Sequence, residues 1–220
     1  ILALMDVVTT QGTIVMPAFS GDYSDPGRWQ NPPVPESWWT IIRRTMPAFD
    51  ARYTPTRGVG LIPEVFRKFP GVQRSNHPSV SFSAWGKHSA GIIEHHTLEN
   101  SLGENSPLGR IYELDGWVLL LGVGYDRNTS FHLAEYRAAN AKPIEAGGPV
   151  YDNNQRTWQW YKDIECDDGE LFITIGSEFE KTEVVAKTRV GMADAVLFRQ
   201  QAAVDFAVTR IAEERKKNAL

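Results

Sequence analysis

The segment from residue 116 to 135 carries the strongest structural signal in this sequence. It begins with an unbroken apolar run, WVLLL at 117–121, that glycines bound on both sides. Such a run is typical of a strand buried on both faces of a helix-covered sheet. Candidate capping residues at 128–130 then predict a helix that begins near Phe131. A strand, a glycine turn and a helix are expected in the order in which open α/β folds place their functional sites.

Two titratable residues fall on one face of that predicted helix. His132 lies in its first turn and Glu135 follows three residues later, so their side chains can meet. An imidazole can take up a proton near neutral pH, and a carboxylate beside it stabilises the imidazolium that forms. The pair is therefore either a general base with its partner or an ordinary structural contact.

Composition limits the classes of function. The net charge of −4 provides no basic surface for nucleic acid, and no apolar run approaches the ~18 residues of a membrane span. The single cysteine, Cys166, excludes an internal disulfide and a multi-cysteine zinc site, and it fits a reducing, cytoplasmic compartment. Two aspartates follow Cys166, and their negative charge disfavours the reactive thiolate.

The order of the patterns predicts one α/β domain over residues 1–220, with a central mixed, largely parallel sheet flanked by helices. Helices are expected at 1–9, 35–45, 60–69, 87–98, 109–114, 131–140, 169–181 and 199–218. Strands are expected at 13–16, 80–82, 117–121, 156–164 and 184–190, with a short apolar segment at 195–198. The segments 18–35 and 143–154 are expected to be loops, and the first is long enough to be a binding loop or lid.

Three blocks of sequence form one pattern along the chain. The first spans residues 60–86 and includes RSNHP at 74–78, and the second is NTSFHLAE at 128–135 after two glycines. The third is Val190-Gly191 followed by Ala193 and Ala195, and TIVMP at 13–17 adds a further match. Together these blocks resemble the aminoglycoside 3-N-acetyltransferase family, over nearly the whole chain.

This resemblance implies a function. Members of the family transfer an acetyl group from acetyl-coenzyme A, without a metal, to an amine of an aminoglycoside, and so confer antibiotic resistance. The partners implied are thus coenzyme A and a small-molecule amine, with neither nucleic acid nor membrane. Family members usually begin with a strand and a cofactor loop ahead of the helix seen here at 1–9. The single domain at 1–220 is therefore expected to lack that strand and loop.

Direct acetyl transfer needs a base for the amine, donors for the oxyanion and a site that holds both substrates. We expect His132 to be the base, Glu135 to orient it, and Thr129 with the free amides of the first helical turn to stabilise the oxyanion. The side chains expected to contact coenzyme A are Arg74, Ser75, His77 and Ser130. For a polycationic substrate the acidic and aromatic candidates are Tyr23, Asp25, Glu99 and Asp152.

Three other readings stay open at this point. The same reaction could use another amine metabolite, or the chain could be a non-catalytic ligand-binding relative. It could also be a metal-dependent hydrolase built on His77, His88, His95 and His96. The last reading is disfavoured because the spacing of these histidines matches no zinc motif. For His77, a packing role is favoured over a place in the pocket wall.

Overall fold

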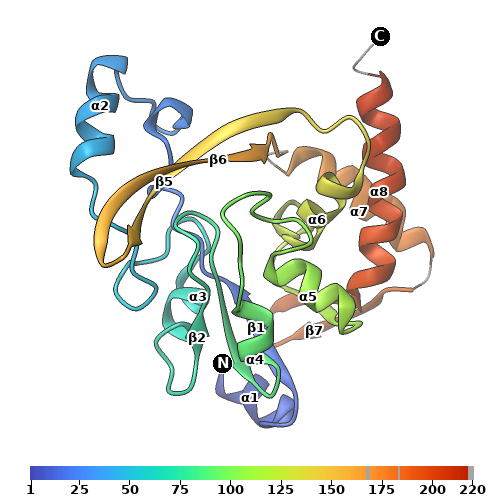
Figure 1. Ribbon diagram of the computed structural model, residues 1–220. Coiled ribbons are helices and arrows are strands. Elements are labelled where there is room, and N and C mark those ends of the chain that lie inside the picture. Colours follow the sequence, from blue (N-terminus) through green and yellow to red (C-terminus); the bar gives the residue numbers. More distant parts are fainter. Residues whose placement is uncertain (167–168, 183, 218–220) are drawn as a thin grey trace. The chain divides into compact units, whose positions relative to one another are not determined.

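The computed structural model describes residues 1–166, 169–182 and 184–217. The backbone contacts divide the chain into two compact units. Unit 1 comprises Ile1–Ser101 and Ile144–Asp163, and unit 2 comprises Leu102–Pro143 and Ile164–Leu220. Figure 1 shows the ribbon of the chain and labels many of its helices and strands. No helix among the described residues is long and apolar enough to cross a membrane.

Unit 1 contains a three-stranded sheet with β3 at its centre, in the order β1-β3-β2. Both neighbours run antiparallel to β3, which places Ile14 opposite Trp85 and Gln73 opposite Ala84. Phe82 and Ala84 of β3 are buried. The elements of this unit up to residue 93 are α1 Leu2–Val8, β1 Thr13–Pro17, η1 Pro26–Arg28, α2 Glu36–Thr45, α3 Leu61–Phe66, β2 Gln73–Arg74, β3 Phe82–Gly86 and α4 Ser89–Ile93.

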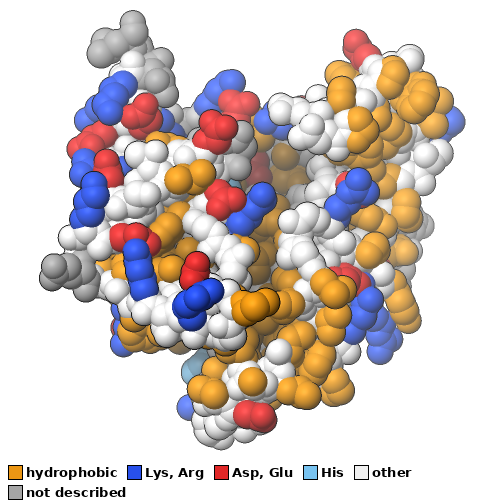
Figure 2. Space-filling view, turned by 180° about the vertical axis from the view of Figure 1, so that it is seen from behind, with side chains coloured by type: hydrophobic (Ala, Val, Ile, Leu, Met, Phe, Trp, Pro, Cys, Tyr) orange, Lys and Arg blue, Asp and Glu red, His pale blue; other side chains and the backbone are white. Residues whose placement is uncertain are grey.

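Helix α2 buries none of its residues completely. Trp38 and Ile41 on this helix are 56% and 53% exposed. Figure 2 shows hydrophobic side chains gathered on it at the upper right. The helix begins after Pro35 with Glu36 in its first turn and has Arg43 and Arg44 in its last turn, the charge order that the helix dipole favours.

A long hairpin completes unit 1 and corrects one prediction. Residues 143–154, expected to be a loop, form β5 (Pro143–Asp152) and the turn into β6 (Gln155–Ile164). The turn residues Asn153 and Asn154 have φ of 47° and 61°, as a two-residue hairpin turn requires. Gly147 lies against Trp158 and Trp160, where a Cβ would come within 2.8 Å of ring atoms. That glycine therefore serves close packing of the strand, although in the sequence it reads as a turn signal.

Unit 2 contains a second antiparallel sheet, in the order β4-β8-β7. Its register pairs Leu119 with Leu197, and Thr188 with Ala195. Ala195 and Phe198 of β8 are both buried. The elements of this unit are α5 Pro107–Glu113, β4 Trp117–Leu121, η2 Tyr125–Arg127, α6 Ser130–Arg137, α7 Glu170–Phe179, η3 Glu180–Thr182, β7 Ala186–Val190, β8 Ala193–Arg199 and α8 Gln200–Lys217.

The predicted central, largely parallel sheet is wrong. Within the described residues the strands form small separate sheets, and the pairings in the sheets β1-β3-β2 and β4-β8-β7 are all antiparallel. The parallel bridge between Ser20 and Arg57 is isolated. The run at 117–121 forms the edge strand β4, with Leu120 4% exposed but Leu119 42% exposed. An apolar run alone does not report whether a strand is central or at an edge.

Aromatic packing fixes the position of α6 within unit 2. The rings of Phe131 and Phe172 meet edge to face at 5.3 Å, and Tyr125 stacks on both Phe131 and Phe198. A Cβ at position 176 of α7 would overlap the Tyr125 ring, so glycine permits this close approach. The first turn of α6 is therefore packed against a cluster of aromatic side chains.

Candidate active site

His132 and Glu135 form a short contact on α6. His132 Nδ1 lies 2.6 Å from Glu135 Oε2, and the two side chains are 19% and 3% exposed. An ionised carboxylate only accepts hydrogen bonds, so Nδ1–H donates to it and the lone pair of the neutral ring lies on Nε2. Phe172 packs edge to face against the imidazole at 5.1 Å. The ring is thus held in one orientation with one nitrogen able to accept a proton.

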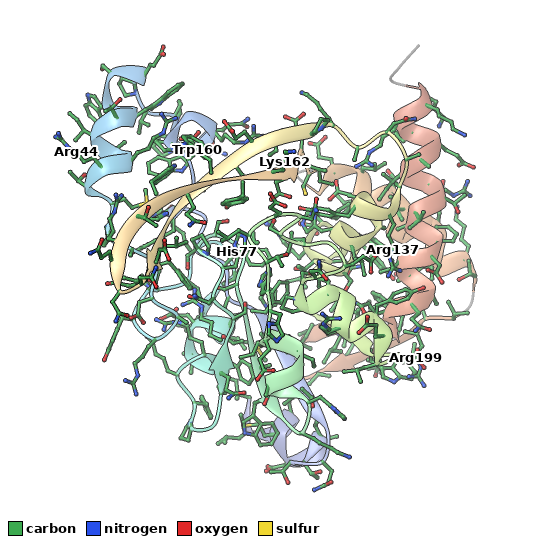
Figure 3. All side chains as sticks on the ribbon, in the orientation of Figure 1. Arg44, His77, Arg137, Trp160, Lys162 and Arg199 are labelled. Carbon is green, nitrogen blue, oxygen red and sulfur yellow. The ribbon has the colours of Figure 1, made fainter. Side chains whose placement is uncertain are left out.

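Hydrogen bonds also anchor the two ends of α6. Asn128 Oδ1 accepts from Ser130 N at 3.3 Å, so Asn128 provides the capping contact that three residues were predicted to compete for. At the other end, Arg215 Nη1 donates to Glu135 O at 2.9 Å. Arg137 of α6, labelled in Figure 3, binds Glu104 through Nε at 2.6 Å. The start of the helix is therefore capped locally, and its last turn is tied to other segments of unit 2.

The predicted free amides at the start of α6 all have partners. The amides of Thr129, Phe131 and His132 donate to backbone oxygens of this turn at 3.0–3.1 Å, and that of Ser130 donates to Asn128. The Thr129 hydroxyl makes no capping bond and its residue is half-buried, and its role as an oxyanion donor stays a prediction. Ser130 is 7% exposed and its Oγ accepts from Gln200 Nε2 at 3.2 Å, an interior contact.

Cys166 lies close to the His132–Glu135 pair. This proximity was not predicted from the sequence. Its Sγ lies within 4.8 Å of a ring nitrogen of His132 and of a carboxylate oxygen of Glu135. Cys166 is 34 positions from His132 in the sequence (166 − 132), so no local spacing could place the two together. The expectation that neighbouring aspartates suppress the thiolate concerned residues 167 and 168, which lie outside the described residues.

Arg74 is surrounded by acceptors within unit 1. Its Nε donates to Ser81 Oγ at 2.9 Å, and the terminal nitrogens donate to Ala51 O, Thr54 O, Ala18 O and Ser20 Oγ. These partners match the five N–H groups of a guanidinium. Burial, followed by the charge of Arg67, lowers the pKa of Arg74 to about 10. Its contacts are those of a structural arginine, and its role in coenzyme A binding stays a prediction.

Ser75, His77 and His96 form a buried polar cluster in unit 1. Ser75 Oγ accepts from Phe82 N and lies 2.9 Å from His96 Nδ1, while His96 Nε2 donates to Ser101 O at 2.7 Å. His77 Nδ1 accepts the amides of residues 79 and 80, and its ring stacks on His96 at 4.9 Å. Figure 3 marks the position of His77. The ring nitrogens of His77 and His96 therefore all have hydrogen-bond partners that suit neutral imidazoles.

Burial lowers the pKa of His96 to about 4, and burial with the His96 charge holds the pKa of His77 well below its ordinary value of 6.5. The unfolded chain binds more protons than the folded chain below pH ~6.5, so stability must fall as the pH drops from there toward 4 and stay level above. Between pH 7 and 5 we expect a loss of roughly 2 kcal/mol for each histidine.

Chemical denaturation at several pH values tests this prediction. In the variant His96→Gln the side-chain amide can keep both hydrogen bonds of His96 but does not titrate. About half of the pH dependence between 7 and 5 should therefore disappear in this variant. An unchanged slope in His96→Gln would contradict the assignment.

The four predicted substrate contacts lie in unit 1 and do not form one cluster of acids. Asp25 is 7% exposed and its carboxylate binds Arg43 Nη2 at 2.7 Å, with Arg43 stacked over Trp160 at 4.9 Å. Tyr23 packs edge to face on Phe49. Glu99 and Asp152 are exposed. Asp25 is therefore committed to an internal ion pair, and the substrate roles of all four stay predictions.

Comparison with known proteins identifies the family. The family model described as aminoglycoside 3-N-acetyltransferase matches residues 1–212. This chain belongs to that family, which confirms the resemblance inferred from its motifs. It is 50% identical to the SPbeta prophage-derived aminoglycoside N(3')-acetyltransferase-like protein YokD of Bacillus subtilis, over 99% of this chain and 80% of that protein. It is 30% identical to aminoglycoside N(3)-acetyltransferase IX of Micromonospora chalcea, over 98% of this chain and 80% of that protein.

Solved structures agree with this assignment. The crystal structure of YokD covers 99% of this chain and 80% of its own, with a TM-score of 0.95 and 50% identity. AAC-IIIb, as a binary complex with CoASH, has a TM-score of 0.83 and 27% identity over 96% of this chain and 81% of its own. AAC-VIa bound to sisomicin has a TM-score of 0.84 and 26% identity over 96% and 82%. The α/β fold is therefore that of the aminoglycoside acetyltransferases.

Proposed function

We propose that this protein is an acetyl-coenzyme A-dependent N-acetyltransferase that acetylates an amine of an aminoglycoside. The observation that carries the proposal is the His132–Glu135 contact of 2.6 Å, in which a carboxylate only 3% exposed holds an imidazole. A buried carboxylate paired to a ring with an available nitrogen is the arrangement of a general base and its orienting partner. Membership of the family, with relatives solved with CoASH and with sisomicin, supports the choice of substrates.

The reaction needs three actions from the protein. Nε2 of His132 removes a proton from the attacking amine, and Glu135 stabilises the imidazolium that forms. The nitrogen attacks the thioester carbonyl, and the Thr129 hydroxyl donates to the oxyanion. The thioester carbon–sulfur bond then breaks, the thiolate of coenzyme A leaves, and the proton held by His132 can pass to it. This sequence of steps requires no covalent enzyme intermediate.

A second candidate keeps the reaction and changes the amine. The carboxylate of Asp25, one of the predicted acidic contacts, forms an ion pair with Arg43. Fewer acids are therefore available to bind a polycation. The relative YokD is itself described only as acetyltransferase-like. These two observations are the reason to keep a less highly charged amine as the second candidate, after the aminoglycoside.

Release of free thiol from acetyl-coenzyme A separates the two candidates. Sisomicin, gentamicin and a panel of monoamines and diamines would each be added to the folded protein with acetyl-coenzyme A. Release with the aminoglycosides supports the first candidate, and release only with the simpler amines supports the second. No amine-dependent release from a protein with a normal circular dichroism spectrum would contradict both.

A further inference from the structure

Cys166, His132 and Glu135 together form a group of three different potential metal ligands. One ring nitrogen of His132, one carboxylate oxygen of Glu135 and Cys166 Sγ all lie within 4.8 Å of one another. Within the part of the chain that the structure describes, no other set of three His, Cys, Asp or Glu side chains has this spacing. We propose that these three side chains form a binding site for a divalent cation of the zinc type.

The chemistry of the donors selects the kind of metal. Imidazole nitrogen, carboxylate oxygen and thiolate sulfur are the three ligand types of protein zinc sites. A thiolate and a carboxylate each supply one negative charge, so with a neutral imidazole the set balances a divalent cation. Magnesium and calcium prefer oxygen ligands and are disfavoured by the sulfur. The site should therefore bind Zn²⁺ and Co²⁺ but not Mg²⁺.

The geometry needs only a small adjustment. Zinc–ligand bonds of ~2.0–2.3 Å place the ligand atoms of a tetrahedral site about 3.3–3.8 Å apart. The group spans at most 4.8 Å, so shifts of about 1 Å close it around an ion. The chain just before Cys166 is fixed to the segment that follows α6, because the amide of Glu165 donates to Lys142 O at 2.9 Å. Three protein ligands leave a fourth position open to solvent or to a ligand atom.

Metal binding would have a consequence for catalysis. A neutral imidazole that binds a cation through one ring nitrogen carries its proton on the other, so His132 keeps no free lone pair as a base and bound Zn²⁺ would inhibit acetyl transfer. This consequence rests on the proposed function, whereas the metal site itself does not. A direct measurement of binding therefore distinguishes failure of the site from failure of the proposed function.

The reactivity of the one cysteine provides such a measurement. Cys166 is the only thiol in the chain, so the rate of alkylation by iodoacetamide reports on this site alone. Zn²⁺ should slow alkylation in a saturable way, and Mg²⁺ at the same concentrations should not. In His132→Gln and in Glu135→Gln, half-maximal protection should require at least tenfold more Zn²⁺. The matched control His88→Gln changes an exposed histidine of unit 1 and should protect as the unchanged protein does.

Two results would overturn the proposal. One is the absence of protection by Zn²⁺. The other is protection in His132→Gln and Glu135→Gln at the same Zn²⁺ concentration as in the unchanged protein, which would mean that the thiol binds the metal without the other two side chains. Because a variant can fail to fold, Co²⁺ is added to the unchanged protein as a second measurement. A thiolate-to-cobalt charge-transfer band with strong visible absorption supports a four-coordinate site, and six-coordinate cobalt without that band would refute it. If both measurements show binding but acetyl transfer resists Zn²⁺, the base assignment fails and the metal site stands.

Discussion

Replacing His132 with alanine should lower kcat for acetyl transfer by ~10²–10⁴ while coenzyme A binding is largely kept. The ring that takes the proton disappears, but the substitution leaves in place every residue predicted to contact coenzyme A. Steady-state kinetics with a saturating amine measures kcat, and calorimetric titration with coenzyme A measures binding. His88→Ala, which removes an exposed histidine of unit 1, is the matched control and should retain full activity.

The partner residue sharpens this prediction. Glu135→Gln keeps the shape of the side chain, but its amide can donate to Nδ1 and so move the ring proton to Nε2. The ring would then offer no lone pair to the amine, so this variant should lose activity nearly as severely as His132→Ala. The double variant should be little worse than either single one, because residues that act as a unit are not additive. A loss of less than a few-fold in His132→Ala would refute the base assignment.

Replacing Arg74 with methionine should destabilise the protein by about 3–5 kcal/mol. Methionine fills much of the space of the arginine stem, but it leaves Ala18 O, Thr54 O and their neighbours without the guanidinium donors they now accept from. The loss of stability is large because a buried acceptor without its donor has lost its water and gained no hydrogen bond in return. Urea denaturation followed by tryptophan fluorescence measures it.

Arg57→Met is the control for this experiment. Arg57 also lies in unit 1, but its ion pair with Asp22 joins side chains that are 67% and 51% exposed, so its removal should cost less than ~1 kcal/mol. Equal stability of the two variants would contradict the structural role of Arg74. An Arg74→Met protein of normal stability that fails to bind coenzyme A would instead restore the predicted cofactor role.

The fold was predictable where a local pattern decides it. The helix at 36–45 follows Pro35 and an acidic first turn, and the strand at 13–17 stops at a proline, both as expected. The helix expected at 87–98 ends at Ile93 because Glu94 is extended and His95 adopts a φ of 56°. Strand β5 was missed because Gly147 and Gly148 read as loop residues, whereas the tryptophans of β6 and the side chain of Pro78 require them.

In the candidate site, too, only the contact between residues close in sequence was predictable. The spacing of three between His132 and Glu135 predicted their contact, and the 2.6 Å distance confirms it. The proximity of Cys166 depends on how the segment after β6 returns to α6, and no spacing within one element encodes it. Arg74 was predicted to contact the phosphates of coenzyme A because it is a cation beside the short hydroxyl of Ser75. Only the tertiary structure shows that its donors face backbone carbonyls of the same unit.

Mass spectrometry of the amine product tests the central claim most directly. The protein would be incubated with acetyl-coenzyme A and sisomicin, and both sisomicin and the released coenzyme A would be quantified. The account predicts sisomicin that carries one additional acetyl group on nitrogen, formed in equal amount to free coenzyme A, with no acetyl group left on the protein. Unmodified sisomicin would contradict the aminoglycoside assignment, and an acetylated protein that later passes its acetyl group to sisomicin would contradict direct attack.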